Sequence, residues 1–464
     1  MFDTICGTIP VDGAMPSRVA RLEALRRVLD GTLYDNLPYQ FHEERNGAGE
    51  YIPLRLRRPS VRYGLCRVVV EDAVALLFSA GHFPAIEAQD ASMARVLADI
   101  FAEARLNEVM IDAALRGSVG SVAVLFRVLG GRMFFSVLES LYLAPVWCED
   151  APDTLARVTE RYKVGGADLA AQGYEDVDPA GLYWFQRVWD TQSETWFVPW
   201  PVDEPLARPV VDETRSVAHG LGFVPLVWIK NLPGGEGVDG GCTFRAAIDT
   251  NIEIDYQLSQ AGRGLKYSSD PTLLIKEPAT SDSEIVKGAG NALVVSEKGD
   301  AKLLEIGGTA AEAVISYVRT LREFALESVH GNRASAEKLA VPQSGRALEL
   351  MNQGLIWLAD NLRISYGDGG ILTLAGMVVK ASQIFPLTVR GEAVGMLDAS
   401  QKLSLRWPRW YPPSADDRLK EAQAVATLVN AGQMSRAAGI KAMAAMNDIG
   451  DVEAELNAID QEAS

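Results

Sequence analysis

The sequence predicts an α+β protein with more than one hydrophobic core. Three observations indicate this class: apolar residues at helical spacing toward both ends of the chain, β-rich runs between about residues 120 and 200, and a helix–strand–helix insertion after residue 241. At 464 residues the chain is too long for one ordinary domain, so roughly two to four cores are expected. Its 48% hydrophobic and 23% charged content is typical of folded globular proteins.

The net charge of −17 argues against a protein that grips nucleic acid. Binding by phosphate neutralisation usually needs a basic surface, so any DNA would be passed along rather than held. The simpler interpretation is that the acidic balance only keeps the protein soluble. Charge alone leaves both interpretations open.

Cysteine usage and the lack of targeting patterns predict a soluble intracellular protein. The four cysteines are far apart and share no zinc-ligand spacing, which indicates free thiols in a reducing compartment. They are Cys6, Cys66, Cys148 and Cys242. The first residues do not combine a basic segment with an apolar core, so no signal peptide is expected. The apolar run from Ile371 to Val379 is too short to span a bilayer.

Helices and one exposed loop are predicted before residue 120. Apolar spacing predicts a helix from Arg18 to Leu29, and a stretch rich in Gly and Pro predicts a loop from Leu33 to Pro59. The nearly apolar run from Val68 to Ala80 fits a buried helix or strand. The stretch from Met93 to Arg116 predicts one long amphipathic helix that ends at Gly117.

The only strong basic cluster in the sequence lies at the end of this loop and just after it. Its members are Arg55, Arg57, Arg58, Arg62 and Arg67. These arginines either form a solvated loop face or contact acidic neighbours or DNA. The sequence does not decide between the two.

Two β-hairpins are predicted between the helices and the insertion. Residues 121–138 read as one hairpin with Gly130 and Gly131 at its turn. Residues 183–200 read as a second, with a polar turn after Trp189. With the preceding helices, they would complete an α+β unit that extends to about residue 230.

The stretch from Asn231 to Gly241, NLPGGEGVDGG, is the strongest break in the chain. It lacks the GxxxxGK[ST] ending and the GxGxxG spacing of phosphate-binding loops, so no lysine would reach a phosphate. A hinge between two parts of the chain is expected here.

The insertion that follows begins with a helix predicted from Thr243 to Leu265. Two apolar stripes on this helix indicate neighbours on two sides, as in a ring of packed helices. The first stripe consists of Phe244, Ile248, Ile252 and Tyr256, and the second of Ile254, Leu258 and Ala261. Three short β runs follow, at residues 272–278, 291–297 and 301–307. They are too few for a stable sheet and would need partners from another subunit or domain.

A second helix is predicted from Thr309 to His330. Thr309 and Glu312 form a capping box at its start, and Gly331 suits the left-handed residue after its end. One face is apolar and comprises Val314, Val318, Leu321, Ala325 and Val329. Another is charged and comprises Glu312, Arg319, Glu323 and Glu327. This charged face is either solvated or, under rotational symmetry, a set of charged rings around a channel.

The rest of the chain is predicted to be mostly helical. The tract from Asn332 to Gln343 is polar, and Ser344 caps a long helix that Gly367–Gly370 should kink or break. Residues 401–407 alternate like a half-buried strand. Ser414 caps a helical tail that becomes polar at its end.

The order of these parts resembles the portal proteins of tailed bacteriophages and prophages, the head-to-tail connector family. The stretches that are similar to that family are VVVEDAVALLFS (68–79), GSVGSVAVLF (117–126), SGRAL (344–348), LSLRWPRWYPPSADD (403–417) and VNAGQMSRAAGIKAM (429–443). The resemblance rests on their order over almost the whole chain.

The resemblance implies a division of the chain into the parts of a portal subunit. Residues 1–241 would be an α+β wing, 242–265 and 309–330 two stem helices, 266–308 a small α/β clip, 331–343 a tunnel loop, 344–413 the remaining wing with a long helix and a return strand, and 414–464 a helical crown. The tunnel-loop residues expected to face DNA are Asn332, Arg333, Glu337 and Lys338. Arg333 and Lys338 would either contact phosphates transiently or be exposed or paired with Glu337.

The resemblance also implies a function. Family members form closed rings, dodecameric in the virion, at one capsid vertex, and double-stranded DNA is packaged and ejected through the channel without sequence specificity. The implied partners are the terminase large subunit, a head–tail adaptor, and the major capsid and scaffolding proteins. The implied location is the virion, after assembly in the cytoplasm of a bacterial host. No catalytic residue, metal, cofactor or membrane contact is implied.

Two other classes of protein fit the sequence less well. A soluble hydrolase would need a catalytic motif, but there is no HExxH and no GxSxG, and the histidines lie apart. These are His42, His82, His219 and His330. Another virion component, such as an adaptor or a capsid-associated protein, would be shorter or would not need the helix–strand–helix insertion. We therefore expect a structural ring protein rather than an enzyme.

Overall fold

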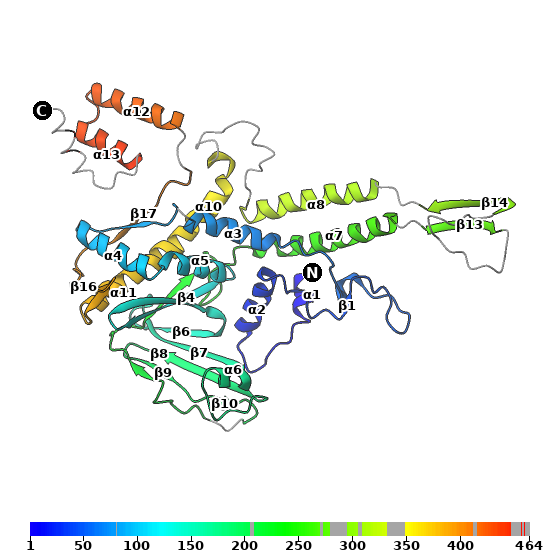
Figure 1. Cartoon of the computed structure of the whole chain (residues 1–464), viewed down its shortest axis with the longest axis horizontal. Helices are drawn as coiled ribbons and strands as arrows, with labels where there is room; N and C mark the ends of the chain where they lie inside the picture. The colour runs from blue at the N-terminus through cyan, green and yellow to red at the C-terminus, as the bar shows by residue number, and fades with distance from the viewer. Residues whose placement is uncertain are drawn as a thin grey trace.

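The computed structural model has a body of helices and sheets from which a pair of long helices projects (Figure 1). It describes residues 1–79, 81–204, 208–269, 272–278, 295–304, 309–331, 349–411 and 415–446, together with Leu456 and Ile459. Helices and strands both contribute to the body, which confirms the α+β class predicted from the sequence.

The first part of the body is mainly helical. Its helices are α1 (Phe2–Cys6), α2 (Ser17–Leu29), α3 (Leu65–Phe78), α4 (Ala91–Glu103) and α5 (Leu106–Gly117). The run that fitted either a helix or a strand is therefore the helix α3. The single helix predicted from Met93 to Arg116 is wrong, because Arg105 takes a left-handed φ of 51° and separates α4 from α5.

The loop predicted from Leu33 to Pro59 contains little regular structure. Two short strands, β1 (Tyr39–Gln40) and β2 (Arg57–Arg58), pair in parallel, and a single 3-10 turn, η1 (Leu54–Leu56), lies just before β2. The loop is therefore folded back on itself close to its two ends.

A three-stranded antiparallel sheet lies beneath the helices, in the order β12-β4-β5. Its strands are β4 (Ser121–Leu129), β5 (Arg132–Glu139) and β12 (Leu226–Lys230). The predicted first hairpin is confirmed, with Gly130 and Gly131 at its turn at φ of 58° and 82°. β4 is the central strand, and its first six residues are buried.

A second, antiparallel sheet packs against the first, in the order β11-β9-β8-β7-β6 with β10 paired to β8. Its strands are β6 (Leu143–Trp147), β7 (Leu155–Gly165), β8 (Leu182–Trp189), β9 (Ser193–Trp196), β10 (Trp200–Pro201) and β11 (Val217–Ala218). The 3-10 turn η2 (Ser140–Tyr142) precedes β6, and helix α6 (Gly166–Ala171) follows β7. The predicted second hairpin is confirmed as β8 and β9.

The stretch from Asn231 to Gly241, predicted as a hinge, is a loop that the body holds in place. The buried carboxylate of Asp239 pairs with Arg18 at 2.7 Å and with Arg21 at 2.9 Å, and accepts the Ser121 hydroxyl at 2.6 Å. Burial raises the pKa of Asp239, but hydrogen bonds from Arg18 and Ser121 lower it more, so it stays below its usual value. The loop is therefore a fixed joint between the body and the insertion.

The insertion is an antiparallel helix pair that carries a β-hairpin at its far end (Figure 1). A 3-10 turn, η3 (Arg245–Ala247), leads into α7 (Ile248–Ser269), which packs along α8 (Thr309–Ser328). The hairpin pairs β13 (Thr272–Pro278) with β14 (Val295–Leu304). The prediction of separate runs at 291–297 and 301–307 is wrong in its described part, because residues 295–304 form one strand.

The C-terminal end of α8 differs from the prediction by one residue. His330, not Gly331, takes the left-handed conformation, with φ of 55°. The amide of Gly331 donates to the Leu326 carbonyl at 2.8 Å and that of His330 to Glu327 at 3.2 Å, the pair of bonds that defines a Schellman motif. Glycine at 331 packs closely on α3, because a Cβ there would lie 3.0 Å from the Val69 side chain.

A long helical rod crosses the body after the insertion. It consists of α10 (Gln353–Leu362), a π-helical segment, η5 (Arg363–Leu372), and α11 (Thr373–Ser382). The stretch from Gly367 to Gly370, predicted to kink or break this helix, does not break the rod but lies in its π-helical turns. A Cβ on Gly370 would lie 2.9 Å from the side chain of Ile229, so the glycine at this position lets Ile229 of β12 approach the rod closely.

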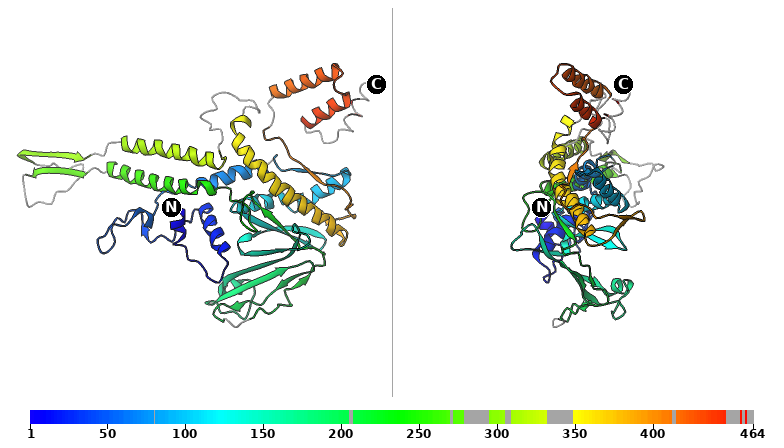
Figure 2. Two further views of the ribbon diagram at one scale, coloured as in Figure 1. Left: turned by 180° about the vertical axis from the view of Figure 1, so that it is seen from behind. Right: turned by 90° about the vertical axis from the view of Figure 1, so that its left-hand side faces the viewer.

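Short strands and a helical hairpin complete the described chain. β15 (Leu387–Val389) pairs with β16 (Glu392–Val394), and β17 (Ser404–Arg406), the strand predicted at 401–407, pairs with β3 (Ala85–Glu87). The predicted helical tail contains α12 (Ala415–Asn430) and α13 (Arg436–Met446). Both lie at the opposite end of the molecule from the second sheet (Figure 2). Within the described ranges, no helix is both long enough and apolar enough to cross a membrane.

Candidate functional sites on the helix pair and in the body

The charged residues predicted on the second insertion helix lie together on the exposed surface of α8. Glu312, Arg319, Glu323 and Glu327 are all exposed. Their spacing places them on one stripe of the helix, as predicted. The stripe faces solvent in the single chain, and a role at a channel stays a prediction.

The predicted apolar face of α8 packs toward α7 and the body. Ala325 and Val329 are buried, and Val314, Val318 and Leu321 are half-buried. Residues near the body are more deeply covered than those near the hairpin. This gradient follows from the position of α8, whose C-terminal end lies beside the body while its start lies toward the hairpin (Figure 1).

α8 also has an aromatic surface that the sequence reasoning missed. Tyr317 is 47% exposed and Phe324 is 60% exposed. They are seven residues apart and therefore lie on one stripe, beside the charged one. The signal was present in the sequence as two aromatic residues outside the predicted apolar face.

The first apolar stripe of α7 is covered by the same chain, but the second is covered only in part, because Leu258 and Ala261 are half-buried. Phe244, Ile248 and Ile254 are fully buried, and Ile252 and Tyr256 are almost so. The first stripe therefore does not require a neighbouring subunit, whereas Leu258 and Ala261 of the second stripe keep part of their surface uncovered, and the ring of packed helices stays a prediction.

A row of polar side chains fixes α7 to the segment that leads into α3. Asn251 Oδ1, Asp255 Oδ1 and Ser259 Oγ accept the backbone amides of Leu65, Tyr63 and Val61 at 2.9, 2.7 and 3.0 Å. Every fourth residue of a helix advances about 6 Å, and every second residue of an extended chain about 6.6 Å. The two spacings match closely enough for three successive bonds.

Asp255 is the buried centre of this row. Its Oδ2 accepts the Tyr34 hydroxyl at 2.7 Å and the Asn251 amide at 3.1 Å. Burial raises the pKa of Asp255 to about 6, although hydrogen bonds from Tyr63 and Tyr34 act in the opposite direction. The carboxylate is therefore held by neutral donors in the core.

The basic cluster of the sequence does not form a continuous basic surface. Arg57 is buried and donates to the Ile52 carbonyl, and Arg58 donates to the Leu37 carbonyl. Arg62 forms an ion pair with Asp35 at 2.9 Å, and Arg67 forms one with Glu71 at 2.7 Å. Four of the five arginines thus satisfy groups of their own chain, and this argues against DNA contact there.

The four predicted tunnel-loop residues lie outside the described residues. They are Asn332, Arg333, Glu337 and Lys338. The described chain stops at Gly331, beside the base of α8, and resumes at Glu349, just before α10.

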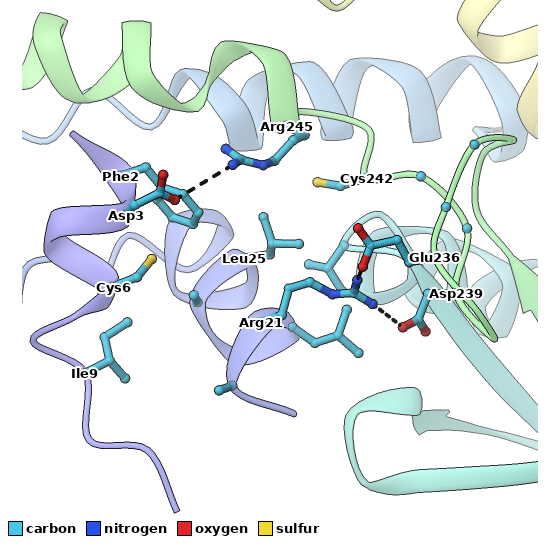
Figure 3. Close-up of a pocket in the computed structure, with 18 of the residues that line it drawn as sticks. Phe2, Asp3, Cys6, Ile9, Arg21, Leu25, Glu236, Asp239, Cys242 and Arg245 are labelled. Carbon is cyan, nitrogen blue, oxygen red and sulfur yellow. Dashed lines mark hydrogen bonds and ion pairs between the residues drawn. The ribbon is translucent and has the colours of Figure 1, made fainter. Parts of the chain in front are cut away.

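A cavity of about 530 Å³ lies between α1, α2 and the loop from Asn231 to Gly241 (Figure 3). Figure 3 shows Arg21 directed at Glu236 and Asp239, and Arg245 directed at Asp3. Two thiols, of Cys6 and Cys242, also line it.

The two thiols that line this cavity are not activated. Burial raises the pKa of Cys6 to about 11 and that of Cys242 to about 12, so both thiols stay protonated at neutral pH and are poor nucleophiles. In the part of the chain that the structure describes, no three His, Cys, Asp or Glu residues are grouped to hold a metal ion.

Comparison of the sequence with known proteins gives no relative: it matches no protein-family model and no curated protein.

Proposed function

We propose that this chain is the subunit of a portal ring of a tailed bacteriophage or prophage, through which double-stranded DNA enters and leaves the capsid. The observation that carries the proposal is the projecting α7–α8 pair with a β-hairpin at its tip, following the order of parts that the sequence resemblance implies. In this proposal α7 and α8 are the stem, β13 and β14 belong to the clip, and α12 and α13 to the crown.

The uncovered aromatic surface of α8 supports self-association. Tyr317 and Phe324 expose large apolar side chains on a helix whose other large apolar residues, where described, are at least half-buried toward α7 or the body, apart from Ile315. Such uncovered surface commonly marks a protein interface. In a closed ring each subunit presents this surface to a different surface of the next subunit.

The charges on α8 suit a conduit rather than a DNA-binding wall. The exposed stripe has three carboxylates, Glu312, Glu323 and Glu327, against one guanidinium, Arg319. Repeated around a ring, it would give an acidic wall that repels phosphates. A strongly basic wall would instead bind DNA tightly by counterion release.

The partners follow from the same proposal. The hairpin strands β13 and β14 pair only with each other among the described strands, which leaves both outer edges for another chain. The terminase large subunit and a head–tail adaptor would dock at this end, and the capsid and scaffolding proteins on the body.

Ring formation can be tested on the purified chain. Native mass spectrometry and negative-stain microscopy should show a closed oligomer, expected to be a dodecamer, with a central hole. Phe324→Glu should shift the mass distribution toward smaller species while the far-ultraviolet circular dichroism stays unchanged. Glu323→Gln, the adjacent residue on the charged stripe, is the matched control and should leave assembly intact. A monomer at high protein concentration in every salt condition would refute the proposal.

The tunnel-loop role needs a separate experiment. Replacing Arg333 and Lys338 by glutamine should leave ring assembly intact and reduce DNA packaging or ejection. Normal packaging by this double variant would remove the proposed contact with DNA.

A further inference from the structure

The second sheet has two faces of opposite character. Its inner face, which packs on the first sheet, carries Val158 and Trp189, both fully buried. The outer face, here called the open face, is formed by the alternate residues of the same strands. The register assigns them to it: Ala144, Val146, Arg157, Thr159, Arg161, Lys163, Leu182, Trp184, Gln186, Val188, Ser193, Thr195, Trp200 and Ala218.

The strand residues of the open face include three cations and no carboxylate. Arg157, Arg161 and Lys163 follow one another along β7, whereas its one carboxylate, Glu160, points to the inner face. There Glu160 and Glu194 are both paired with Arg187. In a chain with a net charge of −17, this separation concentrates positive charge on one surface.

The two arginines of the open face are available to a partner. Arg157 and Arg161 are exposed, and neither makes an ion pair within the described residues. Arg161 lies 4.2 Å over the ring of Trp184 and 5.6 Å from that of Trp200. Stacking holds its guanidinium in place without neutralising it. Lys163 differs, because it is paired with Asp12 at 2.7 Å.

The apolar side chains beside this row indicate the kind of partner. Val146 lies opposite Arg157 and is 43% exposed, and Leu182 at the other end of the face is 50% exposed. Alternate residues of a strand are about 6.6 Å apart, the same repeat as alternate side chains of an extended peptide. From the charge, the spacing and the apolar neighbours we infer that the open face binds an extended segment of another protein that is rich in acidic residues interspersed with apolar ones.

A nucleic acid fits this face less well. Proteins that bind single strands stack bases on exposed aromatic rings, but Trp184 and Trp200 are only 6% and 8% exposed. A phosphodiester backbone would also leave Val146 and Leu182 without apolar contact. Arginine together with apolar residues is typical of protein–protein interfaces.

The inference does not depend on the proposed ring. The open face belongs to the second sheet, which lies apart from α8 (Figures 1 and 2). Changing its charges should therefore alter binding and leave the oligomeric state as it is.

A fluorescent peptide of about ten residues with alternating Glu and Val is the probe, and its anisotropy is measured with the full chain. Binding should weaken as salt is raised, because exposed ion pairs are screened. The double variant Arg157→Gln/Arg161→Gln should bind roughly tenfold more weakly, because it removes two exposed ion pairs with the peptide. Arg95→Gln, which neutralises an exposed arginine on α4, is the matched control and should bind like the wild type.

Several outcomes would overturn the inference. One is equal affinity of the wild type and the double variant, with unchanged circular dichroism in both. Another is tighter binding of a single-stranded or duplex oligonucleotide at this face, lost in the same variant, because that would assign it to nucleic acid. A change in oligomeric state on neutralising the arginines would assign it to a second copy of this chain. If the double variant unfolds, Arg157→Gln alone, whose side chain covers no tryptophan ring, keeps the test intact.

Discussion

Helices α7 and α8 lie side by side in the projecting pair, but the chain covers them to different extents. On α7, the first apolar stripe is buried, the second is buried at Ile254 and half-buried beyond it, and a row of polar side chains is bonded to the segment before α3. On α8, one stripe faces α7 and the body while Tyr317 and Phe324 stay exposed. The difference shows which helix anchors the insertion and which has surface left for another contact.

The largest effect should come from truncating a phenylalanine to alanine just before α7 and, for comparison, one on α8. Phe244→Ala, just before α7, removes a fully buried ring and should destabilise the protein by about 3–5 kcal/mol. Phe324→Ala on α8 removes a ring that is 60% exposed and should change the free energy of unfolding by less than about 0.5 kcal/mol. Denaturant unfolding of dilute protein measures both. Equal losses would mean that α8 is covered as fully as α7.

The pH dependence of stability should separate the buried carboxylate of α7 from the exposed ones of α8. Burial raises the pKa of Asp255 from 3.8 to about 6, so the folded chain binds its proton more tightly than the unfolded chain does. The resulting stabilisation is complete below pH 3.8 and is lost as the pH rises through 6. It amounts to at most about 3 kcal/mol.

Asp255→Asn tests this directly, because the amide keeps an oxygen for the Tyr63 amide but does not titrate. Relative to the wild type, the melting temperature of the variant should rise as the pH increases from about 4 to about 7.5. Glu323→Gln on α8 is the control and should show no such trend, since Glu323 is exposed. If the melting temperatures of Asp255→Asn and the wild type changed in parallel with pH, the raised pKa of the buried Asp255 carboxylate would be contradicted.

The sequence predicted these helices well because their patterns are local. Apolar spacing located both members of the pair, and the glycine pair at 130–131 located a hairpin. The sequence-based prediction failed where contacts between distant segments determine the backbone conformation or the burial of a residue. Nothing in the periodicity shows that Arg105 adopts a left-handed conformation, or that the first stripe of α7 is covered by its own chain rather than by a neighbour.

The polar groups were harder still to predict. The arginines from 55 to 67 are adjacent in sequence, yet they bond to carbonyls and carboxylates that belong to different segments of the fold. The charge separation on the second sheet depends on strand register, which fixes which face each residue of β7 occupies. The hydrogen-bond and ion-pair partners of a residue, unlike its periodicity, cannot be inferred from one stretch of sequence.

A smaller effect is expected from a matched pair of serines on the two helices. Ser259→Ala on α7 leaves the Val61 amide without its acceptor and should cost about 1–2 kcal/mol. Ser316→Ala on α8 changes an exposed side chain and should be neutral or slightly stabilising, because alanine favours helix. Thermal unfolding of both variants checks the difference. Similar costs would indicate that the polar row contributes little to holding α7.

The smallest effect concerns the end of α8, where the left-handed position holds a histidine instead of a glycine. A left-handed conformation costs a residue with a Cβ about 1–2 kcal/mol, and glycine avoids this cost but gains entropy in the unfolded chain. His330→Gly should therefore stabilise the protein by about 0.5–1 kcal/mol, seen as a small rise in melting temperature. Gly331→Ala is the contrasting variant and should not share this gain, since its Cβ would lie 3.0 Å from the Val69 side chain and the change relieves no left-handed backbone. A loss of stability in His330→Gly would instead show that the edge-on contact of His330 with Trp357 is worth more than the strain it relieves.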